Sequence, residues 1–353
     1  MGKRLKVAII GCGLVSSKKH IPALLNLKSK AQIVAVCDLN KDLAAAVAKK
    51  FGIQRIYADL AEMILKESPD VVDICTPPQT HVKLAVEAIE NGCHVMIEKP
   101  MALTVRDCDE MIKASEQYNK QIGIIHNQLF NPAFLKAKKI FLNGEIGDLV
   151  SMNIFLSTPS SYMTSIKDHW AHKLPGGVLG ETGPHSVYLA LSILRGVSNI
   201  NIVAKKLINE FSWSNFEDFK FNLIADNGIC SVTQSYGSNQ WLAQIDILGT
   251  EGLLKVDLQT RSVIKQNRAN LKPANLARSV ISSVAQACSQ LISNVFSILS
   301  PLSLDAHTIG INEYLETILG NKQFTVPAYE GRETVRIMEV LVSKLNSMEL
   351  IKK

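Results

Sequence analysis

The sequence predicts two folds in succession: an α/β domain built on a doubly wound parallel sheet, then an α+β domain with a largely antiparallel, open sheet. Over residues 1–126 short β-branched runs alternate with helical patterns, which is typical of parallel strands joined by crossover helices. Beyond about residue 148 the strands alternate and are joined by the turn pairs Asn227-Gly228 and Glu251-Gly252. We therefore expect two domains, 1–126 and 127–353, with a C-terminal helix that can return toward the first.

Each expected element follows from its periodicity. The strands of the first domain are short apolar runs at 5–10, 32–37, 71–75, 94–97 and 121–125. Helical periodicity fills the gaps at 16–27, 41–51, 59–66, 81–91 and 105–118. Thr104 and Asp107 form a weak capping box at the start of the last helix. Strands of the second domain are expected at 219–225, 229–236, 244–248 and 253–258.

The composition is that of an ordinary folded protein, because hydrophobic residues make up 47% of the 353 residues and charged residues 20%. The net charge of +6 is spread along the chain without a dense basic block, which argues against nucleic acid as a partner. The seven cysteines include no C-x-x-C pair, a pattern that fits buried thiols in a reducing cytoplasm. The apolar stretch 7–10 is too short for an export signal.

A glycine-rich turn stands directly after the first strand and before the first helix. Gly11 permits a tight turn, and Gly13 lets the backbone approach a pyrophosphate that rests on the helix N-terminus. Ser16 takes the third glycine position, and Asp38 ends the second strand, where it can accept hydrogen bonds from ribose hydroxyls. These features predict a dinucleotide-binding Rossmann domain, with a purely structural turn as the alternative. The expected contacts are Gly11, Cys12, Gly13, Leu14, Val15 and Asp38.

Asp38 also indicates which dinucleotide is bound. Its carboxylate would repel a ribose 2′-phosphate, and the next residues, Leu39 and Asn40, offer no cation. NAD is therefore the expected cofactor, with NADP less favoured. Lys41 can reach a phosphate or can serve as a solvated residue in the first turn of its helix.

Further candidate residues follow the strands at 71–75 and 94–97. Open parallel sheets bind ligands outside the carboxyl ends of their strands, so Lys99 is expected where the nicotinamide lies, with Glu98 setting its charge state. A surface lysine before a turn proline is the alternative. The expected cofactor contacts here are Thr76, Pro77, Pro78, His81, Glu98 and Lys99.

A third motif runs from Pro175 to His185 and into an apolar helix through Leu194. Glu181 and His185 are four residues apart and can share one helix face, where the carboxylate would orient or acidify the imidazole. A capping glutamate beside a satisfied core histidine is the alternative.

The order of these motifs resembles that of the Gfo/Idh/MocA oxidoreductase family. The glycine-rich turn, Thr-Pro-Pro with His81, Glu-Lys-Pro and the glycine–histidine segment follow one another, and the stretch 131–147 resembles the family's link into its second domain. The resemblance implies that Lys99, Glu181 and His185 surround the substrate. The family usually has Asp where Glu181 stands, and Tyr188 occupies a position that is often acidic in relatives.

The resemblance also implies hydride transfer between nicotinamide and a hydroxyl carbon of a sugar, cyclitol, sugar acid or sugar nucleotide. This chemistry needs a base for the hydroxyl proton and a cation for the developing alkoxide. We assign these roles to His185 and Lys99, or to the two in reverse, and include Glu181 among the catalytic residues. Candidate substrate contacts are Asn127, His169, Trp170, His172 and Lys173.

Other functions can use some of the same residues. An NAD-dependent glycosidase would employ the same lysine and histidine without net redox change, and a regulatory protein would sense NAD or a sugar at a dead site. A zinc site built from His169, His172, Glu181 and His185 matches no familiar spacing, so no metal is expected.

The segment 279–304 contains no charged residue. Apolar residues recur there at spacings of three and four with polar residues opposite, which predicts a helix with one apolar stripe. The stripe consists of Ile281, Val284, Cys288, Leu291, Val295 and Ile298. The interspersed polar residues and Pro301 argue against membrane insertion. We expect the stripe to pack on the domain or on another subunit, in a homodimer or homotetramer formed through the C-terminal domain. Arg268, Lys272 and Arg278 leave a membrane-surface role open.

Overall fold

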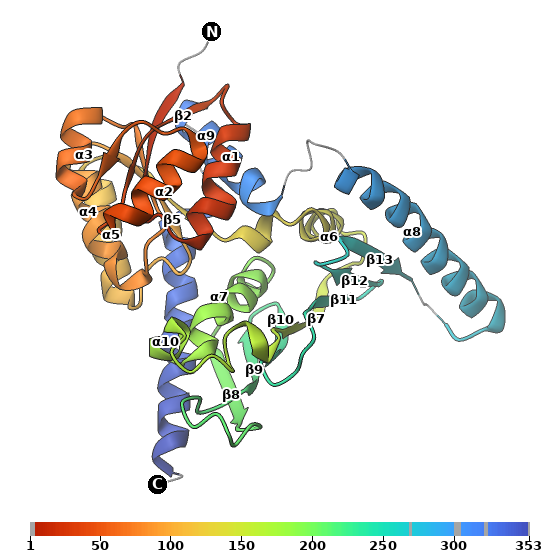
Figure 1. Ribbon diagram of the computed structural model, residues 1–353. Helices are drawn as coiled ribbons and strands as arrows, with labels where there is room; N and C mark the ends of the chain where they lie inside the picture. The colour runs from red at the N-terminus through yellow and green to blue at the C-terminus, as the bar shows by residue number, and fades with distance from the viewer. Residues whose placement is uncertain (1–3, 268–269, 300–304, 321–323, 352–353) are drawn as a thin grey trace. The chain divides into compact units, whose positions relative to one another are not determined.

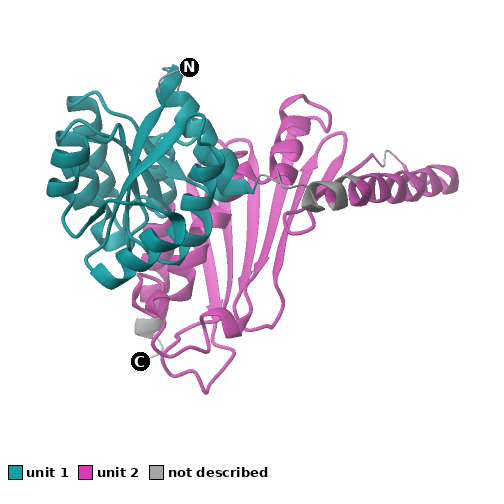
Figure 2. Ribbon diagram, turned by 45° about the horizontal axis from the view of Figure 1, so that its top comes forward, with its two compact units in different colours: residues 1–127, 304–336 teal, residues 128–303, 337–353 magenta. Residues whose placement is uncertain are grey.

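The computed structural model describes residues 4–267, 270–299, 305–320 and 324–351. The chain divides into two compact units (Figure 2). Unit 1 comprises Met1–Asn127 and Leu304–Arg336, and unit 2 comprises Gln128–Ser303 and Ile337–Lys353. Residues 304–336, which the sequence assigns to the second domain, group with unit 1.

Unit 1 takes up this late segment because helix α9, Ala306–Gly320, packs on its sheet. Tyr314 is fully buried, and its hydroxyl donates to the backbone carbonyl of Val95 at 2.8 Å. Gly123 lies under the same ring, so a Cβ there would stand 2.3 Å from a Tyr314 ring carbon. A bulky aromatic opposite a glycine leaves no signal in local periodicity, which explains why the sequence does not reveal this docking.

Unit 1 is built on a parallel sheet with helices on both faces, which confirms the predicted doubly wound fold (Figure 1). Its strand order is β3-β2-β1-β4-β5-β6, and every described pair is parallel. The strands are β1 Leu5–Ile10, β2 Ala31–Cys37, β3 Ile56–Tyr57, β4 Val71–Ile74, β5 His94–Glu98 and β6 Ile122–Ile125. The sequence misses only the short β3 among them.

Side-chain caps define where the helices of unit 1 begin. Asn40, Asp59 and Thr104 each accept hydrogen bonds from backbone amides at a helix start. The helices they open are α2 Lys41–Phe51, α3 Leu60–Glu67 and α5 Val105–Gln117, while α4 spans His81–Glu90.

The first helix departs from the prediction of a regular segment at 16–27. A π-helical turn, Ser16–His20, precedes the short α1, Ile21–Asn26. Pro22 has no N–H to donate and its ring collides with the carbonyl four residues earlier in an α-helix, so the wider turn relieves both conflicts. The turn leaves His20 fully buried.

Unit 2 contains the predicted mixed, largely antiparallel sheet. Its order is β13-β12-β11-β7-β10-β9-β8, and β7 with β10 is the parallel pair. The strands are β7 Leu149–Ser157, β8 Asn199–Lys205, β9 Asp218–Ala225, β10 Gly228–Ser235, β11 Leu242–Gly249, β12 Leu253–Asp257 and β13 Ser262–Gln266. Helices α6, Pro132–Leu142, and α7, Val178–Leu191, pack on this sheet. A shallow hollow of about 680 Å³ lies on outward residues such as Asn153, Phe155 and Thr233.

The helix predicted in the uncharged segment is α8, Pro273–Leu299, which begins earlier and includes Arg278, and its polar side covers edge strand β13. Gln290 exchanges two hydrogen bonds with the backbone of Val263, at 2.6 and 2.7 Å. Gln286 does the same with Lys265, at 2.9 and 3.0 Å. We call this pair of glutamines the amide comb.

The opposite side of α8 is exposed. Ile281, Val284 and Leu291 are 69%, 56% and 65% exposed, and Cys288 is exposed as well. The side chains of Val295 and Ile298 lie outside the described part of the structure, as do residues 300–304 and Arg268. Among the described residues, no helix is long and apolar enough to cross a membrane. Helix α10, Ala328–Ile351, ends the described chain.

Candidate active site

The glycine-rich turn lies at the carboxyl edge of the unit 1 sheet, between β1 and the π-turn. Gly11 has φ +91°, and a Cβ there would lie 2.7 Å from the backbone of Cys75, so no other residue fits. A Cβ at Gly13, in contrast, would meet nothing within 4 Å. Leu14 and Val15 are 59% and 39% exposed. The turn therefore presents open backbone, as a pyrophosphate site requires.

Asp38 fastens this turn to the end of β2. One carboxylate oxygen accepts the amide of Cys12 at 2.7 Å and the other accepts the amide of Asn40 at 2.8 Å. The group is half-buried, and each oxygen retains a lone pair for a ribose hydroxyl. The thiol of Cys12 points inward, and burial raises its pKa to about 12, so only the backbone of this residue faces a ligand. Lys41 is exposed on the first turn of α2.

The loop after β4 is held by two side chains. The Thr80 hydroxyl donates to the carbonyl of Pro77 at 2.8 Å and lies 2.7 Å from the hydroxyl of Thr76. The ring of His81 is buried among backbone carbonyls. Its Nε2 lies 2.9 Å from the carbonyl oxygen of Thr76, and its Nδ1 lies 3.0 Å from the carbonyl oxygen of Pro100. Burial lowers the pKa of His81. We therefore assign His81, an expected cofactor contact, to bracing two loops from inside. Pro78 is also buried.

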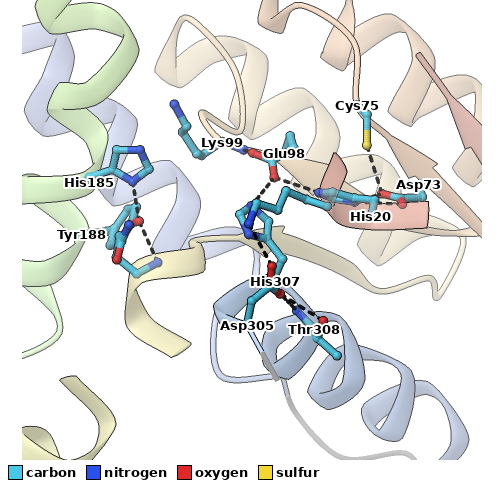
Figure 3. A network of polar contacts seen from close by, with 12 residues as sticks. His20, Asp73, Cys75, Glu98, Lys99, His185, Tyr188, Asp305, His307 and Thr308 are labelled. Atoms are coloured by element: carbon cyan, nitrogen blue, oxygen red, sulfur yellow. Dashed lines mark hydrogen bonds and ion pairs between the residues drawn. The ribbon is translucent and has the colours of Figure 1, made fainter. Parts of the chain in front are cut away.

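Lys99 is the first residue beyond β5 and is half-buried. Its backbone amide donates to the carboxylate of Glu98 at 3.0 Å, and its peptide bond to Pro100 is cis. Glu98 itself is only 8% exposed, and its other oxygen accepts from the ring of His20 at 2.8 Å (Figure 3). Glu98, also an expected cofactor contact, thus points into the protein and anchors the residue that follows it.

In unit 2 the motif at 175–185 contains the start of α7, which begins at Val178. Gly177, with φ +59°, precedes the helix, and Glu181 and His185 follow on successive turns, both half-buried. His185 Nδ1 lies 2.6 Å from the hydroxyl of Tyr188, and that hydroxyl accepts the amide of Gln128 at 3.1 Å (Figure 3). Tyr188 therefore fixes the imidazole. The sequence shows Tyr188 only as a departure from the family pattern, although its spacing of three from His185 predicts contact on a helix.

A neutral hydrogen-bond network holds α7 against β10. Gln234 donates to Thr182 at 2.9 Å and accepts from Ser186 at 3.1 Å, while Thr182 also bonds the buried hydroxyl of Tyr236. Burial raises the pKa of Tyr236, so it stays a phenol. The helix that carries His185 is thus fixed by uncharged groups.

The expected substrate residues differ in exposure. Trp170 is 48% exposed and Lys173 is exposed, whereas His172 places Nε2 3.1 Å from the carbonyl of Ile166 and braces its own loop. His169 accepts the amide of Ala171 at 3.2 Å, and burial lowers its pKa. Asn127 is half-buried beyond β6, at the start of a short 3-10 turn. Among the described residues, the groups near enough to hold a metal include none of the α7 or 169–173 side chains.

Two family models match the chain. Residues 5–126 match the oxidoreductase family with an NAD-binding Rossmann fold, and residues 134–255 match the GFO/IDH/MocA C-terminal domain. Between them the two models cover the glycine-rich turn, Lys99 and His185.

Curated relatives and solved structures agree with these matches. D-glucoside 3-dehydrogenase of Escherichia coli is 34% identical over 41% of this chain and 41% of its own length. D-apiose dehydrogenase of Paraburkholderia graminis is 28% identical over 78% of this chain and 73% of its own. A levoglucosan dehydrogenase solved with NADH and levoglucosan has the same fold, with a TM-score of 0.79 at 19% identity over 97% of each chain. The chain belongs to the Gfo/Idh/MocA oxidoreductase family, and its unit 1 is the family's NAD-binding domain.

Proposed function

We propose that this protein is an NAD-dependent dehydrogenase that oxidises a CH–OH group of a sugar, cyclitol, sugar acid or sugar nucleotide, or reduces the corresponding carbonyl. The observation that carries the proposal is the order of groups along one edge of the unit 1 sheet. Asp38, the glycine-rich turn, Thr76 and Lys99 follow the neighbouring strands β2, β1, β4 and β5.

This order matches the order of groups along a dinucleotide. A ribose at Asp38 and a pyrophosphate on the open backbone at Gly13 leave the nicotinamide toward β4 and β5, the side on which Lys99 lies. Asp38 favours NAD over NADP, because a 2′-phosphate would meet a carboxylate. Replacement of Asp38 by Asn is expected to lower the preference for NAD at least about tenfold, since it removes a repulsion of about 1–4 kcal/mol between the carboxylate and a 2′-phosphate about 4 Å away. An unchanged NAD/NADP ratio of kcat/KM would contradict this assignment.

Lys99 and His185 divide the acid–base work. When bound, NAD accepts the hydride from the alcohol carbon. His185 takes the hydroxyl proton while its Nδ1 is held by Tyr188, and the Lys99 ammonium stabilises the developing alkoxide. Glu181 lies one turn before His185 on α7, and its carboxylate orients or acidifies the imidazole of His185. The two candidate residues come from different units, so their convergence at one substrate is part of the proposal.

The substrate class rests on the relatives and on the exposed groups of unit 2. The glucoside, apiose and levoglucosan enzymes are named for sugars or sugar derivatives. Trp170 offers an exposed ring for stacking and Lys173 an exposed cation, with His169, His172 and Asn127 as the remaining candidate contacts. Seven free thiols suit a reducing cytoplasm as the working compartment.

A substrate screen tests the proposal. Pentoses, hexoses, inositols, uronic acids and sugar nucleotides are mixed with NAD, and nicotinamide absorbance is followed for the wild type, Lys99→Ala and His185→Ala. Lys113→Ala, which changes an exposed lysine on α5, is the matched control. We expect turnover that the two site variants lose and the control keeps. Tight NAD binding without turnover on the whole panel would favour a sensor, and cleavage of a glycoside without net NADH would show a redox-neutral glycosidase.

We also propose that unit 2 forms a homodimer or homotetramer through the exposed stripe of α8. The polar side of this helix is committed to β13, and the described stripe carries no charge, so two copies can meet without like charges in contact. Ile281→Asp with Leu291→Asp is expected to dissociate the assembly in sedimentation velocity. If the double variant sediments with the same assembly mass as the wild type, or if the wild type binds anionic vesicles through α8, the proposed interface is wrong.

A further inference from the structure

A buried ionic cluster lies beneath the strand end that carries Lys99, and the proposed chemistry does not yet use it. His20 is completely buried between two carboxylates (Figure 3). Its Nδ1 lies 2.9 and 3.0 Å from the two oxygens of Asp73, and its Nε2 lies 2.8 Å from Glu98. Asp73 is itself fully buried, in the middle of β4.

The geometry defines the charge of His20. A neutral imidazole carries one N–H, so it can donate to only one of the two carboxylates, whereas an imidazolium donates to both. Two buried carboxylates that share one neutral ring would be left with uncompensated charge. Burial alone lowers the pKa of His20, but Asp73 and Cys75 together outweigh burial and raise the pKa well above 6.5. Burial would raise the pKa of Glu98, and the hydrogen bonds from His20 and His307 hold it well below 4.5.

The other titratable groups around the cluster lie on α9 and after the strands β4, β5 and β6. His307 of α9 approaches Glu98 to 3.5 Å and Lys99 follows Glu98 in sequence. Cys75, after β4, has its pKa raised to about 12 by burial and by Asp73 and stays a thiol. Burial lowers the pKa of His126, after β6, to about 3, so this ring is neutral. His20 is therefore the central cation of the cluster.

The cluster connects the two ends of the cofactor site. His20 ends the π-turn that follows the glycine-rich turn, and Glu98 holds the backbone amide of Lys99 at 3.0 Å. We propose that His20 is a positioning residue: its imidazolium, shared by Asp73 and Glu98, fixes the Glu98 carboxylate and so holds Lys99 in place relative to the dinucleotide turn. This inference rests on the proposed dehydrogenase function.

His20→Gln tests the positioning role, because it removes the cation and keeps a polar side chain. We expect kcat to fall at least about tenfold while the Kd for NAD changes less than about threefold, since the open backbone at Gly13 is untouched. Without the cation, one of the two carboxylates takes up a proton at a higher pH, so the acid limb of kcat should move up by at least about one pH unit. His94→Gln is the matched control, because His94 lies at the opposite end of β5 from Glu98, where its Nδ1 accepts the amide of Gln121 at 3.0 Å, and this variant should leave that limb in place.

The charge of His20 and the effect of its neighbour His307 can each be measured independently of the His20→Gln variant. Nitrogen NMR of the eight histidines in ¹⁵N-labelled protein should show both ring nitrogens of His20 protonated at pH 8, whether or not a substrate is found. If His20→Gln does not fold, His307→Gln should show smaller changes of the same direction in kcat and the acid limb. A singly protonated His20, an unchanged acid limb, or one tightly bound metal ion per chain would overturn the inference. Failure of the proposed function alone would instead show as absent turnover with the NMR result intact.

Discussion

His20 of unit 1 and His185 of unit 2 are both held at Nδ1, yet by partners of different charge. His20 meets the carboxylate of Asp73 and is completely buried, whereas His185 meets the phenol of Tyr188 and is half-buried. A carboxylate stabilises the protonated ring, while a phenol orients a ring without committing it to either charge. Under the two proposals, the same residue type serves as a permanent cation in unit 1 and as a proton-exchanging group in unit 2.

The surroundings of the two histidines extend this difference. Around His20 the partners are ionic, and around α7 they are the hydroxyls and amides of Thr182, Ser186 and Gln234. Removing one member of a buried ionic cluster leaves a bare charge, but removing one hydroxyl leaves only one unsatisfied group. Variants should therefore separate the two regions by the size and kind of their effects.

The largest expected effect is on catalysis. Lys99→Met and His185→Ala should each lower kcat by about 10²–10⁴-fold, since each removes a group that we propose acts on the reacting oxygen or its proton. The Kd for NAD, measured by quenching of protein fluorescence, should stay near the wild-type value in both variants. Full activity of either variant would show that the substituted residue takes no part in catalysis, and for His185 it would contradict the proposed difference from His20.

A large loss of stability is expected from His20→Leu. The variant leaves Asp73 and Glu98 without their shared cation, and loss of one partner from a buried ion pair costs about 3–5 kcal/mol. Urea unfolding at pH 7 measures the change in the free energy of unfolding. A loss below about 1 kcal/mol would mean that His20 is not charged in the folded protein.

The pH dependence of stability sharpens the contrast with a neutral histidine. The pKa of His126 is lowered by burial to about 3 in the folded state, so between pH 6.5 and that value the unfolded chain binds a proton that the folded chain does not. This residue should lower the free energy of unfolding by about 1.4 kcal/mol for each pH unit below 6.5. His126→Asn should reduce the slope by that amount. For His20 the sign is opposite: its raised pKa gives stabilisation that is present below 6.5 and is lost as pH rises through the folded value.

The smallest expected effect comes from Tyr188→Phe. The variant removes the acceptor for the Gln128 amide and the partner of His185 but creates no bare charge, so we expect a loss of about 1–2 kcal/mol. A less firmly oriented imidazole should lower kcat by about tenfold, with KM little changed. If Tyr188→Phe lowers the free energy of unfolding as much as His20→Leu does, the surroundings of the two histidines do not differ as proposed.

Local patterns predicted much of unit 1. The period of the apolar residues gave most of its strands, and Gly11 was expected at a tight turn, where its positive φ and the nearby Cys75 backbone now explain it. The family match confirms the NAD-binding domain. The catalytic roles of Lys99, His185 and Glu181 remain predictions.

The buried cluster could not be read from spacing, because Asp73, Glu98 and His307 are brought together only by strand order and by the docking of α9. One signal was available. Asp73 interrupts an otherwise apolar run, Val71–Ile74, and a charged residue inside a fully buried parallel strand requires a partner of opposite charge.

The amide comb of α8 has a consequence for how the unit 2 sheet ends. Successive helical turns separate Gln286 and Gln290 by about 6 Å, close to the roughly 6.6 Å between Val263 and Lys265 on β13. Side-chain amides can therefore occupy the outward N–H and C=O groups of the strand as a neighbouring strand would. The glutamine side chains thus occupy the outward backbone groups of Val263 and Lys265 on the edge strand β13. A β-strand from another molecule cannot pair with these groups, which protects this edge from aggregation.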